Sequence, residues 1–154
     1  MTYRELVNKV LDIAQRHYMI AEWGYGELSD IKAKGQNDET GEERNADYPY
    51  MFLNPAQHTR DQNSITYRFN LIMMDMAKDD DINEQILRRQ SDCQQYIDDI
   101  LAELYFEMDD LDVDLVVTLT PFKERFQDSV AGMTATLNVI LPLGLNRCIA
   151  PYSS

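Results

Sequence analysis

The sequence predicts an α+β fold, in which one mostly antiparallel β-sheet carries helices on one of its faces. Three observations support this class. Two segments have apolar residues at helical spacing, residues 2–20 and 82–106. Three others alternate as strands do, and residues 48–53 form a short apolar run typical of a strand. The strands fall in two hairpin-like pairs separated by the second helix, in the order α-β-β-α-β-β. The length of 154 residues is that of a single domain able to bury its own core, so we take residues 1–154 as one domain.

Both helices carry recognisable signals in the sequence. Thr2 followed by Glu5 has the spacing of a capping box, so we expect the first helix to begin there. Its apolar spacing continues to about residue 20, and we expect it to fray near residues 23–27. The second helix, residues 82–106, has an apolar stripe that includes Cys93, which is therefore predicted to be a small buried side chain.

The first strand pair consists of residues 48–53 and residues 63–76. In the longer segment, side chains from Ile65 to Met73 at every second position share one apolar face. The opposite face begins polar and becomes apolar at Ile72, Met74 and Met76. We therefore expect the far end of this strand to be covered on both sides.

The second strand pair consists of residues 111–120 and residues 131–141, with residues 121–129 as their connection. The last strand lies in a stretch, residues 130–146, that has no charged side chain although the chain has a net charge of −13. Its predicted inner face is apolar, whereas its outer face is small and uncharged: Gly132, Thr134, Thr136 and Asn138. Such a face suits contact with another protein, because interface cores are depleted in charge.

Two segments lack the regular spacing of apolar residues that is typical of helices and strands. Residues 32–47 are polar and contain glycine, which predicts a long mobile loop. Residues 147–154 follow the last strand and predict an extended C-terminal tail.

The acidic residues are concentrated in one part of the chain. Between Asp75 and Asp114 there are 14 acids and only three bases, which accounts for −11 of the net charge. Such a surface disfavours nucleic-acid binding, since affinity for phosphates comes from Lys and Arg. It remains compatible with a surface that lies near DNA without binding it, or with a simple solvated face.

Candidate chemical sites are weak. The acids from Asp109 to Asp114 could supply oxygen ligands to a metal, but they lack the glycine of a calcium loop and are better interpreted as charges on a solvated strand edge. His17 and His58 lie in no metal or triad motif. Asp30 and Lys32 form an acid-x-lysine pair, as in some nucleases, but no strand pair precedes it. Cys148 beside Arg147 is a lone thiol. We therefore expect no catalytic, cofactor-binding or metal-binding residues, and no enzyme.

The N-terminal segment, the hydropathy and the cysteines indicate where in the cell the protein is found. The N-terminal segment carries charges and does not have the pattern of a signal peptide, and no window approaches 18 apolar residues. The two cysteines form no CxxC motif, which favours a reducing compartment, and because of the missing apolar window we expect no membrane partner.

Taken together, the order and spacing of these segments resemble a known family. The segments are an N-terminal helix, residues 48–53 (YPYMFL), residues 63–76 (NSITYRFNLIMMDM), the second helix, a hairpin containing residues 122–132 (FKERFQDSVAG), and a last strand followed by residues 146–148 (NRC). From residue 2 to 148 the chain resembles the tail-terminator or tail-completion proteins of tailed bacteriophages, the small α+β ring proteins of the neck and tail.

The resemblance implies a structural virion protein without enzymatic activity or cofactors. It would be assembled in the bacterial host cytoplasm into a ring, a hexamer or alternatively a dodecamer. The ring would join neck, portal or tail-tube proteins and leave a channel for DNA, which passes without specific binding. We expect the subunit contacts at Phe122, Phe126, Thr134, Thr136, Arg147 and Tyr152. The acids expected to face the channel are Asp92, Asp98, Asp99 and Glu103.

One alternative of a different class is retained. The methionine-rich strand that contains Met73, Met74 and Met76 could bind a protein partner, since methionine adapts to varied surfaces. The protein would then be a monomeric adaptor or assembly chaperone.

Overall fold

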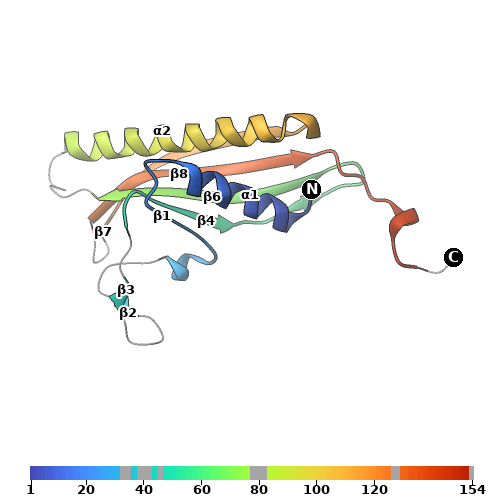
Figure 1. Cartoon of the computed structure of the whole chain (residues 1–154), viewed down its shortest axis with the longest axis horizontal. Coiled ribbons are helices and arrows are strands. Elements are labelled where there is room, and N and C mark those ends of the chain that lie inside the picture. The colour runs from blue at the N-terminus through green and yellow to red at the C-terminus, as the bar shows by residue number, and fades with distance from the viewer. Residues whose placement is uncertain (32–35, 38–42, 45–46, 77–82, 126–128, 153–154) are drawn as a thin grey trace.

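The structure, a computed structural model, describes residues 1–31, 36–37, 43–44, 47–76, 83–125 and 129–152 (Figure 1). It is a mixed α+β domain, with two helices packed against an open sheet of six strands. The elements are α1 (Tyr3–Arg16), β1 (Glu22–Tyr25), η1 (Leu28–Asp30), β2 (Gln36–Asn37), β3 (Glu43–Arg44), β4 (Tyr50–Pro55), β5 (Thr59–Arg60), β6 (Ile65–Met76), α2 (Asn83–Glu107), η2 (Asp109–Leu111), β7 (Asp114–Arg125), β8 (Ser129–Leu141) and η3 (Arg147–Ile149).

The strand order in the sheet is β1-β4-β6-β8-β7, with the short β5 also paired to β6. Every pairing in this sheet is antiparallel except that of β1 with β4. β6, β7 and β8 are the long strands, and β8 pairs with both of the others. β2 and β3 form a separate two-stranded ribbon inside the segment predicted as a loop. The remaining residues of that predicted loop, apart from Asp47, lie outside the described part of the chain.

The start of α1 confirms the predicted capping box. The Thr2 hydroxyl accepts a hydrogen bond from the Glu5 amide at 3.2 Å, and the Glu5 carboxylate accepts one from the Thr2 amide at 3.4 Å. The predicted end at about residue 20 was wrong. α1 ends at Arg16, where His17 adopts an extended conformation and its Nδ1 accepts from the Met19 amide at 3.1 Å. This turn directs the chain into β1, a strand that the predicted fraying had missed.

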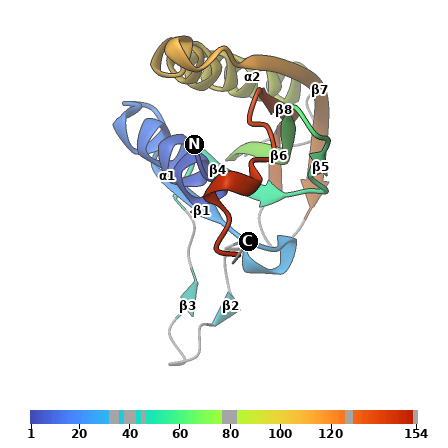
Figure 2. The same cartoon turned by 90° about the vertical axis from the view of Figure 1, so that its right-hand side faces the viewer.

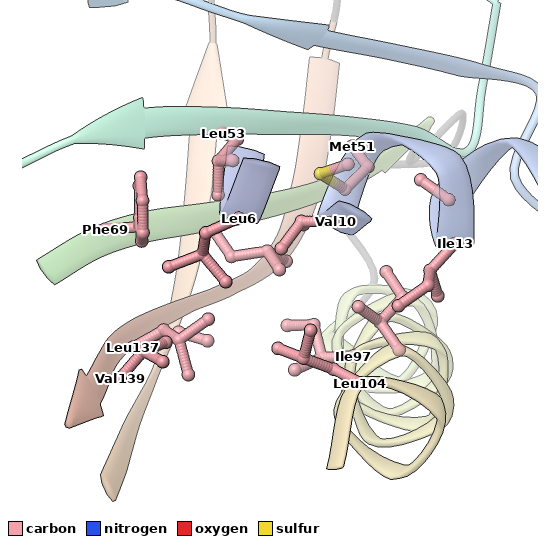
Figure 3. Close-up of a cluster of buried hydrophobic side chains, with 14 of the residues drawn as sticks. Leu6, Val10, Ile13, Met51, Leu53, Phe69, Ile97, Leu104, Leu137 and Val139 are labelled. Carbon is pink, nitrogen blue, oxygen red and sulfur yellow. The ribbon is translucent and has the colours of Figure 1, made fainter. Parts of the chain in front are cut away.

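The core lies between the helices and one face of the sheet (Figures 2 and 3). Leu6, Val10 and Ile13 project from α1, and Ile97 and Leu104 from α2, as Figure 3 shows. They meet side chains of alternating positions on three strands, all of them buried: Met51, Leu53, Phe69, Leu137 and Val139. Burial of this many large apolar side chains supplies most of the driving force for folding. Cys93 is fully buried in this core, as predicted.

A second apolar cluster lies on the opposite face of the sheet. Tyr50, Phe52, Met74 and Val130 form its buried part, and Ile72, Met76 and Phe122 are among the half-buried residues packed on it. The far end of β6 is therefore covered on both sides, as its sequence predicts.

The boundary between β7 and β8 differs from the prediction. The segment expected to connect them is mostly strand, because β7 continues to Arg125 and β8 begins at Ser129. Pro121 did not end the strand because β7 lies at the edge of the sheet, where proline is tolerated. At its other end β7 begins at Asp114 rather than residue 111, since η2 and the left-handed Asp112 precede it.

Gly132 is required by close strand packing. A Cβ atom at this position would overlap the carbonyl oxygen of Met73 and would lie 3.1 Å from Cζ of Phe122. We predict that Gly132→Ala destabilises the fold by about 2–3 kcal/mol, since the strands must move apart to admit the methyl group. Chemical denaturation measures this. Thr134→Ala, two residues along the same face, is the control and should change stability by less than about 1 kcal/mol. Equal effects of the two substitutions would contradict the interpretation.

Candidate interaction surface

The sheet face opposite the helices is partly uncovered, and we call part of it the open face. It comprises the outward side chains at the middle and one end of β6, β7 and β8. These are Thr66, Arg68, Asn70, Ile72, Asp114, Val116, Thr118, Thr120, Thr134, Thr136, Asn138 and Ile140. Val116, the apolar residue on its edge strand, is 54% exposed. Thr118 and Thr120 are exposed beside it, and the β8 side chains are half-buried.

The arginine and asparagine side chains of the open face already have hydrogen-bond partners within the chain. Nε of Arg68 donates to Oδ1 of Asn138 at 2.7 Å, and Nδ2 of Asn138 donates to the Val116 carbonyl at 3.3 Å. Asn70 donates to Asn54 at 3.4 Å. Covering a polar group costs least when it already has a hydrogen-bond partner. The open face is therefore a surface that another protein can cover at modest desolvation cost.

The open face carries almost no charge. Arg68 and Asp114 are its only ionisable side chains, although the chain as a whole has a net charge of −13. The open face and the acidic α2 lie on opposite sides of the sheet (Figure 2). The molecule thus presents a nearly neutral face and an acidic face.

The expected contact residues lie in different places. Thr134 and Thr136 are half-buried on the open face, at alternate positions of β8. Phe122 was expected in a connecting loop, but it lies in β7, where it is half-buried in the second apolar cluster and packs over Gly132. Phe126 lies outside the described residues. Arg147 and Tyr152 are exposed in the C-terminal segment.

Residues 142–152 form what we call the C-terminal arm. Its beginning is attached to the β5–β6 turn, because the Leu145 amide donates to the Gln62 carbonyl at 3.0 Å and Arg60 donates to the Leu143 carbonyl. Beyond this attachment the arm extends past the end of the sheet and contains η3 (Figure 1). Leu145, Ile149 and Tyr152 are 66%, 81% and 77% exposed. The arm therefore displays three exposed large apolar side chains, two of which, Ile149 and Tyr152, lie beyond the attachment.

The four acids expected to face a channel all lie on α2, and three of them pair within the chain. Oδ2 of Asp99 lies 2.8 Å from Nε2 of His17, and Oε1 of Glu103 lies 3.4 Å from Nη1 of Arg16. Asp92 lies 4.0 Å from Arg89. Asp98 is exposed. Asp99 and Glu103 thus also join α2 to the end of α1.

Arg16 is the centre of this link between the helices. It pairs with Asp12 in its own helix and with Glu103 and Glu107 of α2, the last at 2.6 Å. The carboxylates, Glu107 first, raise the pKa of Arg16 above its usual value. Since Nδ1 of His17 accepts from Met19, the ring proton lies on Nε2 and is donated to Asp99. The sequence of α2 alone does not predict these links, because their partners are 82 to 91 positions away.

The other candidate chemical groups have local structural partners. Asp30 accepts a hydrogen bond from the Glu27 amide at 2.9 Å and so closes η1, whereas Lys32 is outside the described residues. His58 packs against Tyr3, Tyr67 and Phe69, and burial lowers its pKa. Within the described ranges, no group of three or more His, Cys, Asp or Glu residues is placed to hold a metal ion. None of the helices in this part of the chain is long and apolar enough to cross a membrane.

The sequence matches none of the known protein-family models. It also matches no curated protein.

The Arg16 pairs are exposed, so their strength should depend on salt. We predict that Arg16→Gln lowers the thermal unfolding midpoint by a few degrees at low ionic strength, and that 1 M NaCl removes most of the difference. Arg4→Gln, an exposed arginine on the same helix, is the control and should have little effect at either salt concentration. A decrease that persists in 1 M NaCl would instead indicate lost packing of the Arg16 stem.

The two cysteines should differ sharply in reactivity. Cys93 is buried, and this burial raises the pKa of its thiol to about 12, whereas Cys148 is exposed on the arm. Because the thiolate is the reactive form, we predict that at pH 8 a chromogenic disulfide reagent titrates one thiol per native chain and two after denaturation. Cys148→Ser should abolish the native reaction. Reaction of both thiols in the native protein would contradict the burial of Cys93.

Proposed function

We propose that this protein is a structural virion subunit of a tailed phage. In this proposal, copies of the chain form a ring at the neck or tail, as a tail terminator or tail-completion protein, and the ring leaves a channel for DNA. The observation that carries the proposal is the coexistence of a nearly neutral sheet face and an exposed apolar arm in a chain of net charge −13. The resemblance in the order and spacing of its segments gives the proposal its specific place in the virion.

Charge supports self-association through the open face. Two copies that each carry −13 repel one another wherever acidic surfaces approach, and only surfaces without acids avoid this cost. The open face, whose only acid is Asp114, comes close to such a surface, and its arginine and asparagine side chains are already hydrogen-bonded. A contact between two different patches closes into a ring when the rotation between subunits is suitable.

The acidic face suits a channel for DNA. Carboxylates repel phosphates, so a lumen lined by α2 would let DNA pass without binding it. The pairing of Asp99 and Glu103 with α1 reduces their contribution, and the exposed acids Asp98, Asp109 and Asp110 then matter more. A structure of the assembled ring with α2 on its outer surface would exclude this role.

The alternative of a monomeric adaptor loses its binding surface. Met73 and Met74 are buried, on the two faces of the sheet, and Met76 is half-buried in the second apolar cluster. A partner could reach the first two only after the sheet opened. The methionines of β6 therefore serve as core side chains.

Assembly can be tested with lysine substitutions on the open face. We predict that the wild-type chain forms ring-shaped oligomers, seen by electron microscopy and as a discrete mass by light scattering at high protein concentration. Thr134→Lys combined with Thr136→Lys should reduce the oligomer at least tenfold, because two charges must then be desolvated at the contact.

The matched control carries the same added charge elsewhere. Gln15→Lys combined with Gln94→Lys places two lysines at exposed positions of α1 and α2 and should leave the oligomer unchanged. Circular dichroism establishes that each variant is folded. A wild-type chain that remains monomeric at every concentration, with or without isolated phage tails, would contradict the proposed function.

A further inference from the structure

We infer that the C-terminal arm of one copy lies across the open face of the next copy. This inference rests on the proposed function and names the contact that would join the subunits. The occupant of the open face is thus residues 146–152 of a second identical chain. Ile149 and Tyr152 supply the apolar contacts, and Val116 and Ile140 lie on the face that receives them.

Beyond residue 145, the described part of the arm makes no backbone hydrogen bond to the body of its own chain. In the described chain, the backbone hydrogen bonds of residues 147–152 stay within the arm: Ala150 donates to Arg147 and Tyr152 donates to Ala150. Asn146 accepts from the Cys148 amide at 2.9 Å and so holds η3 in shape. The arm is therefore locally ordered while its large apolar side chains face solvent, a combination typical of a segment that another surface covers.

Charge selects the open face as the acceptor. Arg147 is the only charged side chain from residue 142 to residue 152, and Asp114 is the only acid of the open face. The arm and the face can thus meet without any like-charged acids in contact, and their single opposite charges attract. The exposed aromatic residues at the end of α2, Tyr105 and Phe106, are a poorer acceptor for another copy because Asp109 and Asp110 adjoin them.

The dimensions of the arm agree with this contact. Residues 146–152 extend at most about 23 Å, at about 3.3 Å per residue. Three neighbouring strands span only about 10 Å across a sheet, so the arm can cross β6, β8 and β7. Pro142, Pro151 and η3 prevent the arm from continuing as a regular strand, which favours lying on the face over pairing with the edge of β7.

The direction of the arm favours a contact between chains. Its attachment to Gln62 and Arg60 fixes its start beyond the end of the sheet. From there it runs away from the body rather than back over the strands (Figures 1 and 2). A neighbouring copy can therefore receive the arm while the arm keeps its observed start.

Cys148 allows a direct test in the full-length chain. Thr118→Cys places a second exposed thiol on the open face, and Cys93 is buried and does not compete. Under mild oxidation, we predict disulfide-linked species of two or more chain masses on a non-reducing gel, at least tenfold more abundant than in the matched control Gln94→Cys. Gln94 is exposed on α2, the helix on the other side of the sheet.

Further variants separate the possible linkages. The linked species should disappear in Thr118→Cys combined with Cys148→Ser, and linkage that persists there would show contact between two open faces and overturn the inference. A disulfide formed within single chains would also overturn it, because the arm would then cover its own face. Equal amounts of linked species in Thr118→Cys and Gln94→Cys would also overturn the inference, because random collisions between chains produce that result.

The outcome is distinguishable from failure of the proposed function. If rings form but Cys148 does not link to position 118, the arm contact is wrong and the ring remains. If no oligomer forms under any condition, both proposals fail. As an independent measurement, Ile149→Asp should reduce the oligomer at least tenfold without affecting the fold, since Ile149 is exposed. Unchanged assembly of this variant would overturn the arm contact.

Discussion

β6 and β8 pair antiparallel over their described lengths, from Ile65 opposite Leu141 to Met76 opposite Val130. Successive side chains on a strand point to opposite faces, so this one register decides which residues enter the core and which form the open face. A shift by one residue would place Thr134, Thr136 and Asn138 against the helices and expose Leu137 and Val139. The large free-energy cost of that exchange holds the register, and the position of the open face follows from it.

The same constraint explains why the strands were more predictable than their ends. Alternation along residues 63–76 and 131–141 is a local signal, and it identified the faces of both strands correctly. The boundaries depend on neighbours that are distant in sequence. β1 is a strand because β4 lies beside it, and β7 extends past Pro121 because β8 supplies partners as far as Ser129. The residues around Trp23 and Pro121 do not indicate that β4 and β8 will lie beside them.

The candidate surface was predictable in part, for a similar reason. The absence of charge from residues 130–146 is visible in one strand, and so are the small side chains of its outer face. The hydrogen bonds that satisfy this face run between strands, from Arg68 to Asn138 and from Asn70 to Asn54, across 70 and 16 positions of sequence. The roles of Asp99 and Glu103 also depend on tertiary contacts, since Arg16 and His17 approach them only when α1 packs against α2.

The distribution of charge then limits how copies of this chain can meet. Long-range repulsion between two molecules of charge −13 is screened over about 8 Å at physiological salt, so it weakens quickly with distance but acts fully on surfaces in contact. Association therefore requires contacts from which acids are missing on both sides. In the described chain, the open face and the arm both have few acids. The open face is broad and partly apolar, whereas the arm is narrow and apolar. Two such different shapes favour a head-to-tail contact over a symmetric one, and repeated head-to-tail contacts build rings. The acids on the other side of the sheet would then keep unrelated surfaces of neighbouring copies apart while the arm and the open face come together.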